Sequence, residues 1–204
     1  MATKGDGTRE RLLVAAERLI LEQGYADTSL DDVLRVTGLT KGAFFHHFKS
    51  KADLGRAVVE RYAENDYALF ADWSAKADRL SDDPYERVLI FLRLFEEFLA
   101  GLSQPLTGCV FASYTYESGK LAPEIGVYIR ERLRMWQQLY EVKLAALIEA
   151  RPPALPVSAA ELAEMIVTLI EGGFVMGNAH ADPTLLQRQS RLFRHYLQLL
   201  FVRR

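Results

Sequence analysis

The sequence predicts an all-α protein of about nine helices, in which a three-helix domain precedes a larger helical one. Three observations support this. Apolar residues recur at helical spacing along most of the chain, capping residues mark the helix starts, and no stretch alternates apolar and polar residues as a strand would. With 204 residues, half of them apolar, the chain is long enough to bury a sizeable core.

Hydroxyl or acidic residues stand where helices are expected to begin. Three pairs have the spacing at which a hydroxyl caps the first turn and a carboxylate reaches back: Thr28 with Asp31, Ser50 with Asp53, and Ser158 with Glu161. Two acids precede a proline suited to the first helical position: Asp83 before Pro84, and Asp182 before Pro183.

The first three helices are predicted over residues 8–23, 29–37 and about 40–46. Gly24 ends the first, and Gly38 makes the turn between the other two. The first has an apolar face that we expect to pack on the next two, formed by Leu12, Leu13, Ala16, Leu19 and Ile20. Two short helices around a tight glycine turn predict a helix-turn-helix.

Six more helices follow. One begins at Lys51, and another, after the Ser-Asp-Asp-Pro stretch at 81–84, carries a broad apolar face. A loop at 103–108 then precedes a short helix at 109–118 and a long one at 123–150. Prolines between 152 and 156 separate these from the last two helices, about 159–180 and 184–202.

The last two helices, about 159–202, suit an interface between two copies of the chain. The first of them is apolar almost all round, and Gly172, Gly173 and Gly177 allow close approach. The final helix is expected to have an apolar face formed by Leu185, Leu192, Phe193, Tyr196, Leu197 and Leu200. This pattern fits a four-helix interface with a second copy, and equally fits packing within one chain.

Charge is distributed unevenly along the chain. The net charge of −2 and the pI near 6.1 argue against a general nucleic-acid coat protein, so any DNA contact must be local. Lys41, Lys49 and Lys51 lie in a stretch, residues 40–52, that has no acid. In a helix placed in the major groove, Lys41 could reach a guanine edge or a phosphate, the hydroxyl of Thr40 could meet the backbone, and small side chains at 42 and 43 would allow close approach.

The order of residues over 8–55 resembles the DNA-binding end of the TetR family of transcriptional repressors. The matching residues are Gly24-Tyr25, Thr28-Ser29-Leu30, Asp31-Asp32, Gly38-Leu39-Thr40-Lys41-Gly42, Phe44-Phe45, His47-Phe48 and Lys49-Ser50-Lys51. The resemblance implies a flexible arm at 1–7, a DNA-binding domain at 8–54 and an effector-binding and dimerisation domain at 55–204. It also implies a homodimeric, cytoplasmic repressor on a near-palindromic operator.

The residues expected to contact double-stranded operator DNA are Thr28, Thr40, Lys41, Gly42, Ala43, Phe45, His46, His47 and Lys51. The resemblance assigns positions 45–47 to the contact surface and gives Lys51 a phosphate. Family members commonly have Tyr where this chain has Phe45, so the hydroxyl contact to phosphate is replaced by a thymine methyl contact or by packing. Thr28, at the head of a helix, gains a phosphate role because free backbone amides there favour anions.

The resemblance also implies a pocket for a small-molecule effector in the larger domain. The expected lining is Phe91, Phe95, Cys109, Phe111, Tyr114, Trp136 and Phe174, which suggests an apolar or aromatic effector, although such residues also form ordinary cores. Cys109 follows Thr107-Gly108 at a predicted helix start, where amides favour the thiolate. It resembles the sensor cysteine of members that respond to electrophiles or oxidants, and the alternative is a buried apolar residue.

Other classes of protein find little support. The single cysteine excludes an intrachain disulfide, and no histidine has a partner at metal-ligand spacing. There is no P-loop, Gly-x-Ser-x-Gly or dinucleotide fingerprint, so we expect no cofactor and no enzymatic activity. No apolar run could span a bilayer or serve as a signal peptide, which favours the cytoplasm. A helical adaptor that binds protein and not DNA is the alternative function.

Overall fold

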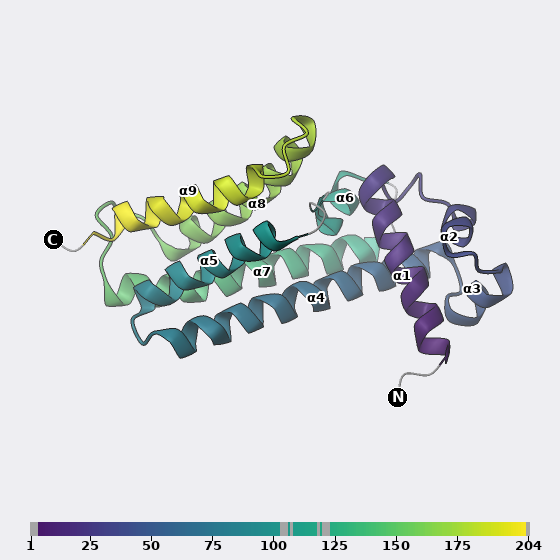
Figure 1. Ribbon diagram of the computed structural model, residues 1–204, viewed down its shortest axis with the longest axis horizontal. Coiled ribbons are helices and arrows are strands. Elements are labelled where there is room, and N and C mark those ends of the chain that lie inside the picture. The colour runs from purple at the N-terminus through teal and green to yellow at the C-terminus, as the bar shows by residue number, and fades with distance from the viewer. Residues whose placement is uncertain (1–3, 103–105, 107, 118, 120–122, 203–204) are drawn as a thin grey trace. The chain divides into compact units, whose positions relative to one another are not determined.

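The computed structural model describes residues 4–102, 106, 108–117, 119 and 123–202 (Figure 1). Within this part of the chain there are nine α-helices and no strand, which confirms the predicted fold class. The helices are α1 (Lys4–Gln23), α2 (Leu30–Thr37), α3 (Lys41–His47), α4 (Lys51–Leu80), α5 (Pro84–Gly101), α6 (Val110–Tyr116), α7 (Pro123–Ala150), α8 (Ala159–Ala179) and α9 (Leu185–Leu200).

Contacts divide the chain into two compact units. The first unit comprises Met1–Asn65 and Cys109–Arg132, and the second comprises Asp66–Gly108 and Leu133–Arg204. The first unit therefore includes α6 and the beginning of α7, a grouping that the boundary expected after residue 54 does not anticipate. Most of the loop expected at 103–108 and the last residue of the helix expected at 109–118 lie outside the described residues.

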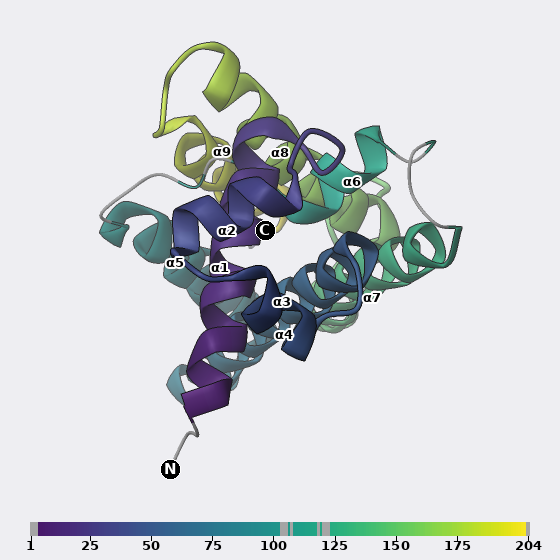
Figure 2. The same cartoon turned by 90° about the vertical axis from the view of Figure 1, so that its right-hand side faces the viewer.

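In the first unit, α1 packs against α2, α3 and α6 (Figures 1 and 2). The predicted apolar face of α1 is buried, each of its residues being at most 6% exposed: Leu12, Leu13, Ala16, Leu19 and Ile20. α1 begins at Lys4, within the arm expected at 1–7, whose first three residues lie outside the described part. The apolar pattern could not reveal this start, because residues 4–7 have no apolar side chain.

The cap of α2 lies one residue later than predicted. Ser29 is the N-cap: its hydroxyl accepts from the backbone N–H of Asp32, and the Asp32 carboxylate accepts from that of Ser29, both at 3.1 Å. Thr28 instead donates its hydroxyl to the carbonyl of Gly24 at 2.7 Å and is only 3% exposed. α2, capped in this way, buries Val33 and Leu34 and packs against α1.

Three other predicted caps are present. Ser158 and Glu161 form a capping box on α8, Asp83 caps α5 ahead of a proline, and the Ser50 hydroxyl accepts from the Asp53 N–H at 3.1 Å. The Asp53 carboxylate, however, reaches the N–H of Lys49 and not that of Ser50.

The expectation that Asp182 begins the last helix at Pro183 is wrong, since α9 begins at Leu185. Asp182 accepts instead from the N–H of Thr184 at 3.0 Å, closing a turn that follows Ala181 in the left-handed conformation (φ 51°). A capping acid two residues before the bonded amide fits this turn as well as a helix start, so the sequence did not separate them.

The core of the second unit is rich in aromatic rings. Phe91 of α5 contacts Phe70 of α4 at 4.5 Å between ring centroids and Tyr140 of α7 at 5.8 Å. α9 packs against both α5 and α8 (Figure 1), and Gly173 allows its close approach, because a Cβ there would lie 2.8 Å from Leu186 Cδ1. Of the six residues expected on one face of α9, Phe193, Leu197 and Leu200 enter this core, whereas Leu192 is 55% exposed.

A buried ion pair joins α5 to α9 within this core. Arg194 donates from Nε to Glu96 Oε1 at 2.8 Å and from Nη2 to Glu96 Oε2 at 3.0 Å. Both side chains are at most 10% exposed. The two-point geometry satisfies both carboxylate oxygens, which a buried charge requires.

Candidate nucleic-acid interface

The segment from Ser29 to Phe48 folds as two short helices around a glycine turn, as predicted. α2 ends at Gly38, whose φ of 66° lies in the left-handed region that glycine favours. Thr40 then caps α3, its hydroxyl accepting from the N–H of Ala43 at 3.2 Å. One side-chain cap, that of Thr40, and one glycine therefore fix the turn between the helices.

Buried aromatic side chains hold α3 onto the first unit. Phe44 is fully buried and Phe48 is 3% exposed, with 5.7 Å between their ring centroids. The guanidinium of Arg9 lies over the Phe48 ring at 5.4 Å. These contacts place both rings in the core of the first unit, and they turn the intervening residues outward.

Most of the predicted contact residues lie on the outward side of this segment. Thr40, Lys41, Gly42, Phe45 and His46 are exposed, and Ala43, His47 and Lys51 are partly buried. Phe45 is 55% exposed and stands edge-on to Phe44, with 5.2 Å between the centroids. Thr28, by contrast, is buried beneath the surface, so its hydroxyl is not presented to a ligand.

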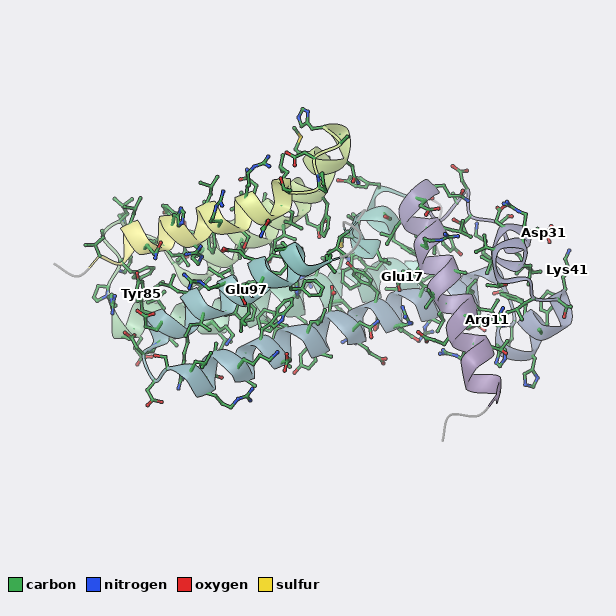
Figure 3. All side chains as sticks on the ribbon, viewed as in Figure 1. Arg11, Glu17, Asp31, Lys41, Tyr85 and Glu97 are labelled. Atoms are coloured by element: carbon green, nitrogen blue, oxygen red, sulfur yellow. The ribbon has the colours of Figure 1, made fainter. Side chains whose placement is uncertain are left out.

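Lys41 forms an ion pair with Asp31. Its Nζ lies 3.2 Å from Asp31 Oδ1, and both side chains are more than 60% exposed, at the starts of α3 and α2 (Figure 3). An exposed pair of this kind contributes little to stability and can exchange partners readily. The ammonium is therefore available to another anion.

Lys51 is engaged by the turn between α1 and α2. Its Nζ donates to the carbonyl of Ala26 at 2.9 Å and lies 4.6 Å from the centroid of the Tyr25 ring. Burial lowers the pKa of Lys51, and the negative charges of Glu117 and Asp27 oppose that shift. One of its three donors is thus committed within the first unit.

Arg11 is a further residue of this region, and the sequence alone does not predict its role. Its Nη2 donates to the carbonyl of Thr37, the last residue of α2, at 2.6 Å (Figure 3 labels Arg11 on α1). The bond ties α1 to the end of α2 and satisfies a carbonyl that has no partner within the helix. No pattern of side chains could have revealed it, because the partner is a backbone atom.

The residues expected to line an effector pocket fall into two groups. Cys109, Phe111 and Tyr114 belong to the first unit and are each at most 6% exposed. Cys109 is the N-cap of α6 and makes no side-chain cap bond there. The others belong to the second unit, where Phe91 and Phe95 are buried and Trp136 and Phe174 pack against the core.

The second unit contains a cavity of about 330 Å³ at the turn between α8 and α9. Of the expected pocket residues, Phe174 lines it. The other lining residues, mostly apolar or small, are Leu99, Leu102, Leu106, Gly173, Gly177, Asn178, Ala181, Asp182, Pro183, Leu186 and Gln187. Asp182 is paired with Arg188 at 2.6 Å, so the carboxylate at the cavity is compensated. The size lies at the lower end of the range for small-molecule sites.

Two family models cover both parts of this arrangement. "Bacterial regulatory proteins, tetR family" matches residues 12–58, and "Transcriptional regulator LmrA/YxaF-like, C-terminal domain" matches residues 84–192, more than half of the chain. The chain belongs to the TetR family of transcriptional regulators.

The chain is also similar to individual transcriptional regulators. The transcriptional regulator AcuR of Cereibacter sphaeroides is 29% identical over 131 residues, 63% of this chain and 57% of AcuR. The repressor NemR of Escherichia coli is 40% identical over 55 residues, 27% of this chain and 28% of NemR. The matches therefore span less than two thirds of either relative. A crystal structure of a TetR regulator from Chloroflexus aurantiacus superposes with a TM-score of 0.79, at 25% identity over 97% of both chains.

Membership of the TetR family explains the helix-turn-helix, since regulators of this family bind operator DNA. Among the described residues, no group of three or more His, Cys, Asp or Glu side chains is placed to hold a metal ion. No helix of that part of the chain is long and apolar enough to cross a membrane.

Proposed function

We propose that the protein is a homodimeric repressor that reads a near-palindromic operator through α3 and is released by a small effector. One observation carries the proposal: α3 turns Lys41, Gly42, Phe45 and His46 outward, has no acidic residue, and sits in a helix-turn-helix fixed by caps at both helices. Two such helices, about 34 Å apart in a dimer, would enter successive major grooves.

The exposed side chains of the helix-turn-helix suggest the individual DNA contacts. Lys41 exchanges Asp31 for a guanine edge or a phosphate, and Gly42 and Ala43 let the helix sit deep. Phe45 presents its ring to a thymine methyl. The phosphate contact expected of Thr28 passes to Ser29, the exposed N-cap of α2, because Thr28 is buried. The DNA sugar-phosphate backbone is contacted by Thr40, His46, His47 and the remaining donors of Lys51.

The dimer would form through α8 and α9. Exposed apolar residues lie at helical spacing on both: Met165, Val175 and Met176 on α8, and Leu192 and Leu199 on α9. A second copy would cover them in a four-helix interface. Leu192→Glu together with Leu199→Glu should yield monomers in sedimentation, whereas Leu155→Glu, at another exposed apolar position, should leave the dimer intact.

Operator binding is tested with the chain's own upstream promoter region and a pool of random duplexes at two salt concentrations. Lys41→Ala should weaken binding to the selected duplexes about tenfold and reduce the salt slope by about two, because each copy in the dimer loses one cationic contact. Lys76→Ala, an exposed lysine of the second unit paired with Asp72, is the matched control. The absence of any selective binding by the native chain would favour the adaptor alternative.

For the effector we propose the cavity beside Phe174 and a neutral, mainly apolar ligand. The lining offers apolar surface and the amides of Asn178 and Gln187, and its one charged group is already paired. 1-Octanol should raise the unfolding temperature of the native chain, whereas Leu99→Trp, which fills the cavity, should abolish the rise. Octanoate is the charged comparison and should bind more weakly.

Modification of Cys109 is the second route to release. Because the residue is 6% exposed, a reagent can reach its sulfur only after local opening of α6. N-Ethylmaleimide should then release operator from the native chain and leave Cys109→Ser bound. Equal behaviour of the two proteins would leave the cavity as the effector site.

A further inference from the structure

In the turn between α1 and α2, two oppositely charged side chains, Glu117 and Lys51, bind the backbone of one residue, Ala26. The N–H of Ala26 donates to Glu117 Oε2 at 2.7 Å, and the carbonyl of Ala26 accepts from Lys51 Nζ at 2.9 Å. Glu117 follows α6 as its C-cap, and Lys51 is the first residue of α4. Both backbone groups of Ala26 are thus bound by charged groups from other helices, which are stronger partners than neutral ones.

The surrounding backbone is shaped to admit the Glu117 carboxylate. Gly24 has a φ of 86°, and a Cβ built on it would lie 2.2 Å from Glu117 Oε1. A Cβ there would displace the carboxylate from this position, and glycine adopts this φ without strain. The Gly24 carbonyl accepts from the Thr28 hydroxyl at 2.7 Å, so the turn continues directly into the capped start of α2.

A buried anchor fixes α6 beside this turn. Tyr114 is fully buried and donates its hydroxyl to the carbonyl of Gly55 in α4 at 3.0 Å. Its ring packs on Tyr25 with 4.9 Å between centroids. A Cβ at Gly55 would lie 2.4 Å from Tyr25 Cε2, so the contact requires a glycine there. The buried contacts of Tyr114 therefore fix the position of Glu117, three residues further along the chain.

We infer that Glu117 is a positioning residue for operator reading. It touches no DNA in this role. It orients the Ala26 turn and thereby α2, which is joined to α3 by the Gly38 turn and the Thr40 cap. The inference rests on the proposed function, and it names a route for regulation: an event that shifts α6 acts on the reading helices through one carboxylate.

Three substitutions of Glu117 separate this role from simple electrostatics. Glu117→Ala removes a negative charge, which by itself would tighten DNA binding. Loss of positioning should instead weaken the affinity for the selected operator about tenfold. Glu117→Gln keeps an acceptor for Ala26 and should recover most of the affinity. Glu117→Asp keeps the charge but is shorter, and should behave like the Ala variant. Glu124→Ala, an exposed acid of α7 in the same unit, is the charge-matched control.

Hydrogen exchange at the Ala26 amide is the second readout and needs no DNA. The amide should be protected in the native chain and in Glu117→Gln, and exposed in Glu117→Ala while α1 and α4 stay protected. Operator binding by Glu117→Ala that equals or exceeds that of Glu124→Ala would overturn the positioning role alone. A native chain that selects no duplex would overturn the proposed function and the positioning role with it.

Discussion

The two units of the molecule are held together by different interactions. In the first unit, Arg11, Lys51 and Glu117 each bind a backbone atom of another helix or turn. In the second unit, rings from three helices pack on one another, as Phe70, Phe91 and Tyr140 do. The difference follows helix length: α2 and α3 have 8 and 7 residues, whereas the helices that lie wholly within the second unit, α5, α8 and α9, have 16 to 21.

Short helices bury less apolar surface than long ones, so charged side chains that bind backbone atoms add to the buried rings of Phe44 and Phe48 in fixing the orientation of α2 and α3. These hydrogen bonds between charged side chains and backbone atoms can break and form again without leaving a void in the core. Packed rings cannot move singly, because interiors are dense and every shift leaves a void. The first unit is thus suited to adjustment and the second to a stable shape.

The largest expected effect is loss of a core ring in the second unit. Phe91→Ala should lower the free energy of unfolding by about 3–5 kcal/mol, because Phe91 is 1% exposed and touches several rings. Phe45→Ala removes a half-exposed ring of the first unit and should change stability by less than about 1 kcal/mol. Urea unfolding followed by circular dichroism measures both, and similar losses would contradict the comparison.

The buried ion pair tests whether packing alone holds the second unit. Arg194→Leu should cost about 3 kcal/mol, because Glu96 is left buried without its partner. Glu96→Leu combined with Arg194→Leu should recover most of that loss, since an apolar pair of similar volume replaces the charges. If the double variant is as unstable as the single one, the charges themselves stabilise the second unit.

A smaller effect is expected from the first unit's contact at the end of α2. Arg11→Ala should lower the free energy of unfolding by about 1.5 kcal/mol through loss of a charge-assisted bond to Thr37. Hydrogen exchange should quicken in α2 before it does in α1. Arg18→Ala on the same helix, whose exposed pair with Glu22 is 3.8 Å long, should change little and serves as the control.

The smallest effect concerns capping, which both units share. Hydrogen bonds from Ser29 and Arg35 lower the pKa of Asp32 to about 2, and bonds from Ser158 lower the pKa of Glu161. A carboxyl group whose pKa is lowered by folding stabilises the fold at every pH above its unfolded pKa of about 4. This stabilisation is lost as the pH falls toward 2. The unfolding temperature should therefore fall less steeply between pH 5 and 2 in Asp32→Asn than in the native chain. Equal slopes would show that the box is not formed in solution.

The features set by local chemistry were predictable from the sequence. The helices, the Gly38 turn, the Thr40 cap and the Ser158 box each depend on neighbouring residues. The choice of Ser29 over Thr28 was not, because each has an aspartate three residues later, and only the bond from the Thr28 hydroxyl to the Gly24 carbonyl separates them. Arg11 and Glu117 escaped prediction because their partners are backbone atoms far along the chain.

Both tryptophans of the chain, Trp73 and Trp136, lie in the second unit. Trp73 packs against Phe91, Phe95 and Phe98, and Trp136 against Tyr140. Intrinsic indole emission therefore reports the aromatic core and is silent on the helix-turn-helix. A fluorescence titration that shows no change on adding operator would say nothing about α3, unless an indole had first been placed there, for example by Phe45→Trp.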